Sequence, residues 1–171
     1  MKSLTIAATV AITLLVATPA HAYSAMVSFE DLVKESEVIV LARVVNVRDS
    51  ADQTGHERVA TATVLERWKA PLHLDRVEYV ASPGWFMCDT SGAKAGETVV
   101  LFLQRDPSDH RLHIAHFGRG RMPVRREDSQ AYAAIYEVTF PSEVRVRQQM
   151  KSPHAEVVLL SALKEAVLRL P

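Results

Sequence analysis

Three histidines, His110, His113 and His116, lie close together in the chain. Imidazole nitrogens are common zinc ligands, and on a helix this three-residue spacing would bring neighbouring side chains together. The segment from Arg111 to Phe117, however, has the pattern of a β-strand. In a strand His113 points away from His116, and His110 lies about 20 Å from His116. We therefore expect ordinary surface or partly buried histidines, with a zinc site as the alternative, and we predict no metal and no cofactor.

Cys88 is the only cysteine of the chain. Its neighbours Phe86 and Met87 favour a buried, unreactive thiol, since no nearby base or helix N-terminus is evident to lower its pKa. A disulfide to another chain and a catalytic role are the alternatives.

Two arginines flanked by glycines stand out in the segment from Phe117 to Arg126. Arg119 and Arg121 alternate with Gly118 and Gly120, and glycines let a backbone approach an anion or a partner closely. We predict that both arginines contribute to partner binding, although a solvated loop is the simpler interpretation of this segment.

Composition excludes several classes of protein. The 171 residues are 48% hydrophobic and 23% charged, with 20 basic and 20 acidic side chains. This is the balance of a globular domain, and it lacks the basic excess of most nucleic-acid binders. The sequence has no nucleophile elbow, zinc-protease helix, phosphate loop or dinucleotide fingerprint. We predict that the protein is not an enzyme.

The first 22 residues have the pattern of a signal peptide. Lys2 precedes a short apolar run from Leu4 to Thr18, and Ala20-His21-Ala22 places small residues at a cleavage site. The run is too short for a membrane span. We expect a soluble protein, exported to the periplasm or the medium, with Tyr23 at its N-terminus.

The next hundred residues have the pattern of a small barrel. Ser28 and Asp31 resemble a capping box that opens a short helix over residues 29–35. Short β-patterned segments separated by turn residues then favour a barrel or sandwich over a parallel sheet. We predict five strands, over residues 38–47, 58–68, 74–80, 98–103 and 111–117.

The remaining residues favour helices. The segment from Asp128 to Glu137 is compatible with a helix. Ser152 and Pro153 suit the start of a second helix, in which Leu159, Leu163 and Val167 recur at helical spacing. We expect this helix to cover an opening or edge of the barrel, with partner binding as the alternative. The predicted domains are residues 1–22 (signal peptide), 23–120 (barrel) and 121–171 (C-terminal extension).

The order of these segments resembles a known family. A strand over residues 36–44 is followed by Arg67-Trp68-Lys69-Ala70-Pro71, by Ala81-Ser82-Pro83-Gly84-Trp85-Phe86-Met87-Cys88 and by the segment of residues 95–103. This order resembles the netrin-like domain of tissue inhibitors of metalloproteinases and its secreted bacterial relatives. The resemblance covers residues 29–117 and implies a mainly β fold: a five-stranded OB-type barrel, with a short N-terminal helix and a C-terminal helical appendage.

The chain also departs from that family. In the inhibitors an N-terminal cysteine chelates the zinc of the protease and is bonded to the cysteine at the position of Cys88. This chain is expected to begin with Tyr23, so the zinc-chelating mechanism is not implied. The family places the loop of Trp85 and Phe86 beside the contact ridge of the inhibitor, so these side chains either bind a partner or cap the barrel.

The residues leave three candidate functions. The first is an exported, non-enzymatic binding module that contacts another exported protein or modulates a protease through Trp85, Phe86, Arg119 and Arg121. The second is an OB-type module that binds an oligosaccharide or another small ligand, with nucleic acid disfavoured by the neutral charge. The third is a hydrolase built around His116.

Overall fold

The computed structural model describes residues 26–50, 57–82, 92–148 and 156–171. Trp85, Phe86, Cys88 and the predicted signal peptide lie outside these residues. The elements are β1 (Val27–Ser28), α1 (Phe29–Glu35), β2 (Val38–Asp49), β3 (Arg58–Lys69), β4 (Arg76–Ser82), β5 (Thr98–Arg105), β6 (Leu112–Ile114), β7 (Arg121–Glu127), β8 (Gln130–Ile135), β9 (Val138–Thr139), β10 (Val146–Gln148), β11 (Glu156–Leu159) and α2 (Leu160–Arg169).

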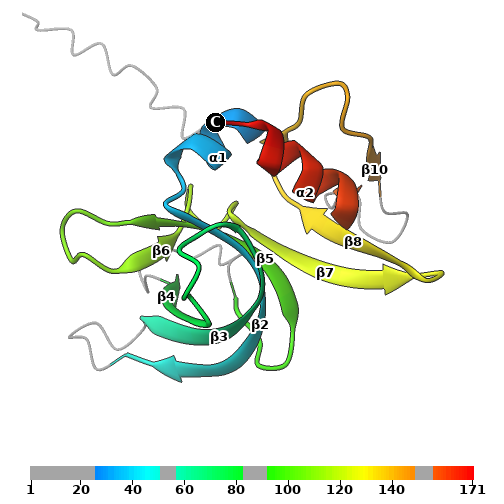
Figure 1. Cartoon of the computed structure of the whole chain (residues 1–171). Helices are drawn as coiled ribbons and strands as arrows, with labels where there is room; N and C mark the ends of the chain where they lie inside the picture. Colours follow the sequence, from blue (N-terminus) through cyan, green and yellow to red (C-terminus); the bar gives the residue numbers. More distant parts are fainter. Residues whose placement is uncertain (1–25, 51–56, 83–91, 149–155) are drawn as a thin grey trace, which may run out of the picture.

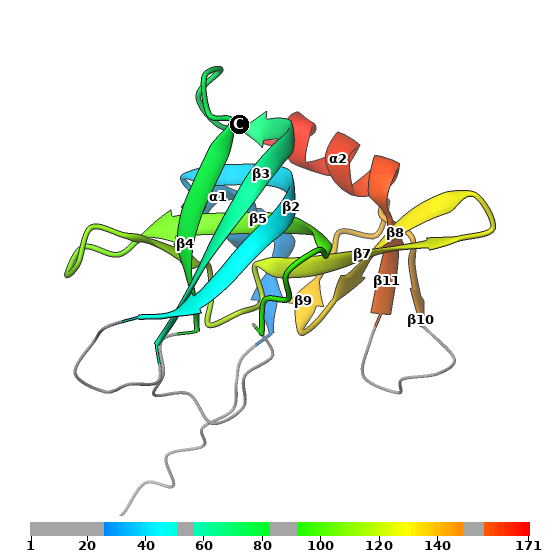
Figure 2. The ribbon, with the colours of Figure 1, turned by 90° about the horizontal axis from the view of Figure 1, so that it is seen from below.

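Five strands form a closed barrel in the order β5-β2-β3-β4-β6, and a pairing between β6 and β5 closes it. The strands β2, β3 and β4 form an antiparallel meander, whereas β6 runs parallel to β4. This mixed order is that of an OB-type fold, so the predicted fold class is confirmed. Figures 1 and 2 show the barrel beside a second group of strands covered by α2.

The strand β5 and the first part of β2, residues 38–42, are buried on both faces. Their side chains alternate between the barrel interior and a second hydrophobic cluster outside the barrel. On β5, Leu101 and Leu103 face the interior, whereas Val100 and Phe102 face the outer cluster. This arrangement explains why both strands have nearly continuous apolar sequences.

The helix α1 begins as predicted. The side chain of Ser28 accepts a hydrogen bond from the backbone N–H of Asp31 at 3.0 Å. Phe29, Leu32 and Val33 are buried in the outer cluster, so the cap fixes where the helix meets the barrel.

The predicted fifth strand is interrupted. Only Leu112–Ile114 forms β6, and the chain then loops outward through His116 and Phe117, which both have positive φ, before β7 resumes pairing with β5. Residues with Cβ atoms rarely adopt such a φ, so the sequence did not indicate this loop. Both ends of the loop bond to Phe102, because its carbonyl accepts from Ala115 N at 2.9 Å and its N–H donates to Gly120 O at 2.8 Å.

The prediction of a helix between Asp128 and Glu137 is wrong, because this segment contains the strand β8. Asp128 and Ser129 form a turn with positive φ, and it joins β7 and β8 into an antiparallel hairpin. The strand β8 pairs further with β11, and β11 with β10. The cross-strand pairs of β8 therefore override its helix-compatible composition.

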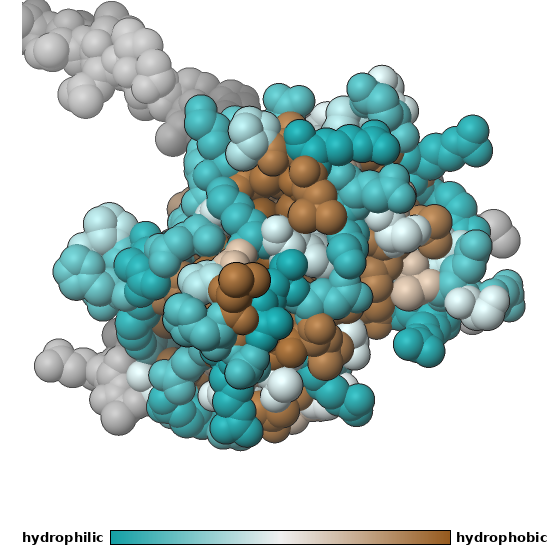
Figure 3. Space-filling view, viewed as in Figure 1, coloured by the Kyte–Doolittle hydropathy of each residue, from teal (hydrophilic) through white to brown (hydrophobic). Residues whose placement is uncertain are grey.

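The C-terminal helix is present but starts later than predicted. Residues Glu156–Leu159 form β11, and α2 begins at Leu160. Leu163 and Val167 are buried in the outer cluster, where α2 contacts β3, β8 and β11. Figure 3 shows apolar atoms gathered around α1 and α2 on a largely hydrophilic face. No helix within the described ranges is long and apolar enough to cross a membrane.

The predicted boundary at residue 120 falls just before β7. Because β7 pairs with β5, the strands after residue 120 continue one sheet that begins in the barrel.

Candidate functional site

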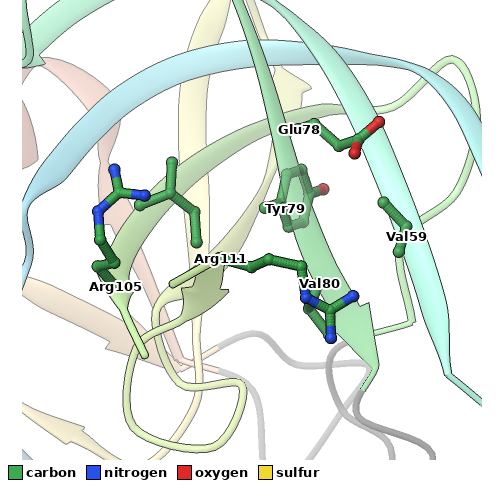
Figure 4. Close-up of a pocket in the computed structure, with 7 residues that line it drawn as sticks. Val59, Glu78, Tyr79, Val80, Arg105 and Arg111 are labelled. Atoms are coloured by element: carbon green, nitrogen blue, oxygen red, sulfur yellow. The ribbon is translucent and has the colours of Figure 1, made fainter. Parts of the chain in front are cut away.

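A cleft lies on the outside of the barrel, where β3 and β4 meet the turn before β6. Its volume is about 180 Å³. Val59 of β3 and Val80 of β4 are paired across the two strands, and both line the cleft. Figure 4 shows them with Glu78 and Tyr79, with Arg105 at the end of β5, and with Arg111, whose side chain extends toward Val80.

Ion pairs fix the wall formed by Arg111. Its guanidinium donates to both carboxylate oxygens of Glu57, at 2.6 and 2.7 Å, and the side chain of Glu57 is only 8% exposed. Its Nε donates to Asp109 at 2.8 Å, and His113 Nε2 lies 2.9 Å from the same carboxylate oxygen. A two-pronged pair of this kind restrains both position and orientation.

These contacts also set the protonation of the wall. The bond to Glu57, followed by the bond to Asp109, raises the pKa of Arg111. Burial alone would raise the pKa of Asp109, but hydrogen bonds from the backbone N–H of Arg111, from His113 and from the Arg111 side chain outweigh it. The pKa of Asp109 is therefore lowered, and the wall stays an ion-paired network at neutral pH.

The second arginine of the cleft is also paired. Arg105 donates to both oxygens of Glu37, at 3.0 and 2.7 Å, and to the carbonyl of His110 at 2.7 Å. The turn between β5 and β6 is thus held from two sides. Because both arginines have carboxylate partners, the cleft offers a rigid apolar floor with little net charge.

The sheet beside the cleft carries ordered rows of outward-facing residues. Directly opposite residues on paired strands share a face. Row one is Arg43, Thr63 and Arg76; row two is Asn46, Thr61 and Glu78; row three is Arg48, Val59 and Val80. We call these rows the three-strand face. Row three reaches the cleft, so cleft and face form one surface.

The predicted residues Arg119 and Arg121 lie elsewhere, in ion pairs within the fold. Arg119 Nη2 donates to Glu137 at 2.6 Å, and Arg121 Nη2 donates to Glu97 at 2.5 Å, where the Arg121 side chain is 7% exposed. Contact of these two arginines with a partner stays a prediction, as it does for Trp85 and Phe86, which lie outside the described residues.

Near Arg121 the barrel buries a tyrosine. The Tyr79 hydroxyl is buried and has no hydrogen-bond partner among the residues that the structure describes. Burial raises the pKa of Tyr79, and the nearby charge of Arg121 opposes this effect only in part. The phenol is therefore neutral at physiological pH.

The three histidines do not converge. His113 pairs with Asp109, His116 Nε2 lies 3.1 Å from Glu35 of α1, and His110 lies in the turn with positive φ. In the part of the chain that the structure describes, no group of three His, Cys, Asp or Glu side chains is placed to hold a metal.

A second cleft, of about 420 Å³, lies between β3, β8 and the start of α2. Glu66 is central to it, because its carboxylate accepts from Lys164 Nζ at 2.7 Å and from the Trp68 indole N–H at 3.2 Å. These bonds, with that of Lys164 the stronger influence, lower the pKa of Glu66. The contacts join α2 to the barrel.

Sequence reasoning missed the three-strand face and the cleft. The alternation of polar and apolar residues over 74–80 is enough to place Arg76 and Glu78 outward, but it does not show which residues of β2 and β3 lie opposite them. That register contains irregularities, one of them between Val44 and Asn46. Only the paired strands reveal the rows.

No protein-family model matches this chain, and no curated protein is similar to it in sequence. Its class therefore comes from the fold: an OB-type barrel with flanking helices.

Proposed function

We propose that this protein is an exported, non-enzymatic binding module whose ligand lies in the cleft and on the three-strand face. The observation that carries the proposal is the position of the cleft. It is formed by the second and third barrel strands, β3 and β4, and by the turn between the last two, β5 and β6. OB-type barrels commonly bind oligomeric ligands with this combination of strands and loop.

The chemistry of the cleft supports binding rather than turnover. Arg105, Arg111 and Asp109 are all held in ion pairs or hydrogen bonds with neighbouring side chains. A side chain fixed in this way shapes a surface well, whereas a general base needs access to the proton that it removes. The floor of the cleft is apolar but largely covered, since Val59 and Val80 are 5% and 3% exposed, so an uncharged group would contact it together with the partly buried Leu112.

The experiment is an NMR titration of the isotope-labelled mature protein with a panel of oligosaccharides, an acidic peptide and oligothymidylate. We expect the amide signals of Val59, Val80 and Leu112 to shift with an oligosaccharide. Shifts confined to residues outside the cleft and the three-strand face would contradict the proposal. A Leu112→Glu variant should weaken binding, and thermal unfolding checks that the fold tolerates the change, because Leu112 also packs against the barrel interior. Leu72→Glu, at an exposed leucine in the β3–β4 turn, is the control outside the cleft.

A protein ligand is the second candidate, and a different surface favours it. Phe117, Met26 and Tyr136 are large apolar side chains that are 65%, 61% and 39% exposed. Contacts through Glu137 join their segments, since Glu137 accepts from Arg119 and its carbonyl accepts from Val27 N at 3.1 Å. Exposed aromatic side chains are frequent anchors of protein interfaces.

As part of this second candidate, we propose that the protein is related to the netrin-like inhibitors that its sequence resembles. Without an N-terminal cysteine, we expect no inhibition of zinc endopeptidases by direct metal contact. An inhibition assay tests this, together with a variant that carries an additional alanine before Tyr23. Tight inhibition that the alanine abolishes would contradict the expectation. Inhibition that instead depends on Phe117 or Trp85 would support a protein interface away from the metal.

A further inference from the structure

We propose that the ligand of the three-strand face is a polysaccharide that carries carboxylate groups, and that Arg43 and Arg76 bind those groups. This inference rests on the proposed function, because it adds the chemical class of the ligand to the same surface. The observation that leads to it is a difference among the arginines of the barrel.

Most barrel arginines are neutralised by a carboxylate. Arg48 pairs with Glu78, Arg67 with Asp75, and Arg111 with Glu57. Within the described residues, Arg43 and Arg76 have no such partner, although both are exposed. They also lie in the same row: Arg43 on β2 and Arg76 on β4 are each paired with Thr63 of β3, which lies between them.

Among the residues that the structure describes, Arg43 and Arg76 place two like charges in one row with no carboxylate at ion-pair distance, since Glu78 of the next row is paired with Arg48. Two strand spacings separate the backbones of Arg43 and Arg76 by about 10 Å, which the long side chains can span or share. Like charges at this distance repel, and an anion between or along them relieves that repulsion. Because guanidinium groups match carboxylates in a two-pronged geometry, the row fits acidic groups on a ligand.

The rest of the face identifies a saccharide rather than a peptide or nucleic acid. β3, in the middle of the face, is paired with β2 on one side and β4 on the other over residues 58–63, so a peptide finds no strand edge to extend there. The outward residues of rows one to three include no aromatic side chain on which bases would stack. Thr61, Thr63 and Asn46 instead offer hydroxyl and amide groups that can bond sugar hydroxyls.

The rows also set the length of the ligand. Thr63 of row one lies four residues along β3 from Val59 of row three. This separation corresponds to about 13 Å, so a chain of several sugar units can occupy the cleft and reach the arginines.

The test is isothermal titration calorimetry of the mature protein with oligogalacturonate and with the same oligomer as its methyl ester. Esterification removes the charge and retains the sugar chain. We expect the acidic oligomer to bind at least about tenfold more tightly than the ester. The Arg43→Gln/Arg76→Gln variant should lose this preference, and its affinity should depend less on salt.

The control variant is Arg126→Gln/Arg145→Gln, which removes two exposed charges elsewhere in the chain and should bind as the wild type does. Equal binding of ester and acid, unaffected by Arg43→Gln/Arg76→Gln, would overturn the inference and leave the proposed cleft intact. Tighter binding of oligothymidylate would overturn the ligand class. Failure of every saccharide to bind would overturn both the inference and the proposed function. Thermal unfolding of each variant checks that the fold is retained.

Discussion

The two hydrophobic cores of this protein differ in composition and in how they are assembled. The barrel interior is filled mainly by valine, alanine and leucine, with Tyr79 as its aromatic residue. The outer cluster contains Phe29, Trp68 and Phe102, with the ring of Phe140 stacked on Phe29 at a centroid distance of 4.7 Å. Small side chains suit the narrow inside of a barrel, whereas aromatic rings fill the wider gap between layers.

The two cores also differ in the elements that build them, and this shows which elements depend on one another for their packing. The inner core comes almost entirely from the barrel strands, whereas the outer core also needs α1, α2, β8 and β11. Since β2 and β5 contribute to both, they form a wall shared by the cores. A substitution on one side of this wall should disturb one core more than the other.

The largest effect is expected from substitutions on opposite sides of β5. Phe102→Ala removes the edge-to-face contact with Phe29 and should destabilise the protein by about 3–5 kcal/mol. Leu101→Ala, on the interior side, should cost about 2–5 kcal/mol. Hydrogen exchange should show α1 opening in the Phe102 variant alone. If α1 opens equally in both variants, the two cores are not separable.

A large effect is also expected from the charged end of the barrel interior. Arg121→Met leaves the partly buried Glu97 without its ion pair and should cost about 3 kcal/mol in urea unfolding. The Arg121→Met/Glu97→Leu variant should recover most of this loss, because no uncompensated charge remains. A single variant as stable as the wild type would show that the pair contributes nothing to the inner core.

An intermediate effect is expected at the joint between the cores. A Cβ at Gly120 would lie 2.6 Å from the carbonyl oxygen of Phe102, so Gly120→Ala must displace backbone and should cost about 1–3 kcal/mol. Gly96→Ala is the control, because Gly96 has φ +87 and open space around its Cβ position. That variant tests conformational strain alone. A milder effect at Gly120 than at Gly96 in thermal unfolding would contradict the crowding.

The smallest effect is expected at the rim of the outer core. The bond from Lys164 holds the pKa of Glu66 below its ordinary 4.5, so the pair stabilises the fold above that pH and loses its effect as the carboxylate protonates. Both side chains are about two-fifths exposed, so Lys164→Met should cost only about 0.2–1 kcal/mol at pH 7. The difference between variant and wild type should shrink as the pH falls below 4.5. A difference that grows in acid would have the wrong sign for this pair.

Much of the barrel could be predicted from the sequence, because its strands have clear patterns. A nearly continuous apolar run marks the first part of β2, and alternation marks β4, in which Val77 and Tyr79 are buried. The capping box of α1 could be predicted for the same reason, because it involves only Ser28 and Asp31, three residues apart. These features depend on neighbouring residues in the chain, which the sequence shows directly.

The later elements could not be predicted because tertiary pairing determines them. Gln130–Ile135 contains alanines that favour a helix, but it lies between β7 and β11 and becomes a strand. Leu159 of β11 continues the helical spacing of Leu163 and Val167 in α2, yet the adjacent valines of β11 pair with alanines of β8. Arg43 and Arg76 could not be matched either, since their row depends on the register of three strands.

The outward loop between β6 and β7 has a consequence for how the chain finds its fold. Both strands use the same edge of β5, with β6 on Leu103–Arg105 and β7 on Val99–Leu101. The two strands therefore compete for this edge during folding. If either strand paired two residues out of register along β5, it would occupy positions that the other strand needs. Barrel closure and growth of the second sheet should then be kinetically coupled, and refolding followed by stopped-flow fluorescence should show the two events in a single phase. Two separate phases would show instead that β6 and β7 pair with β5 independently.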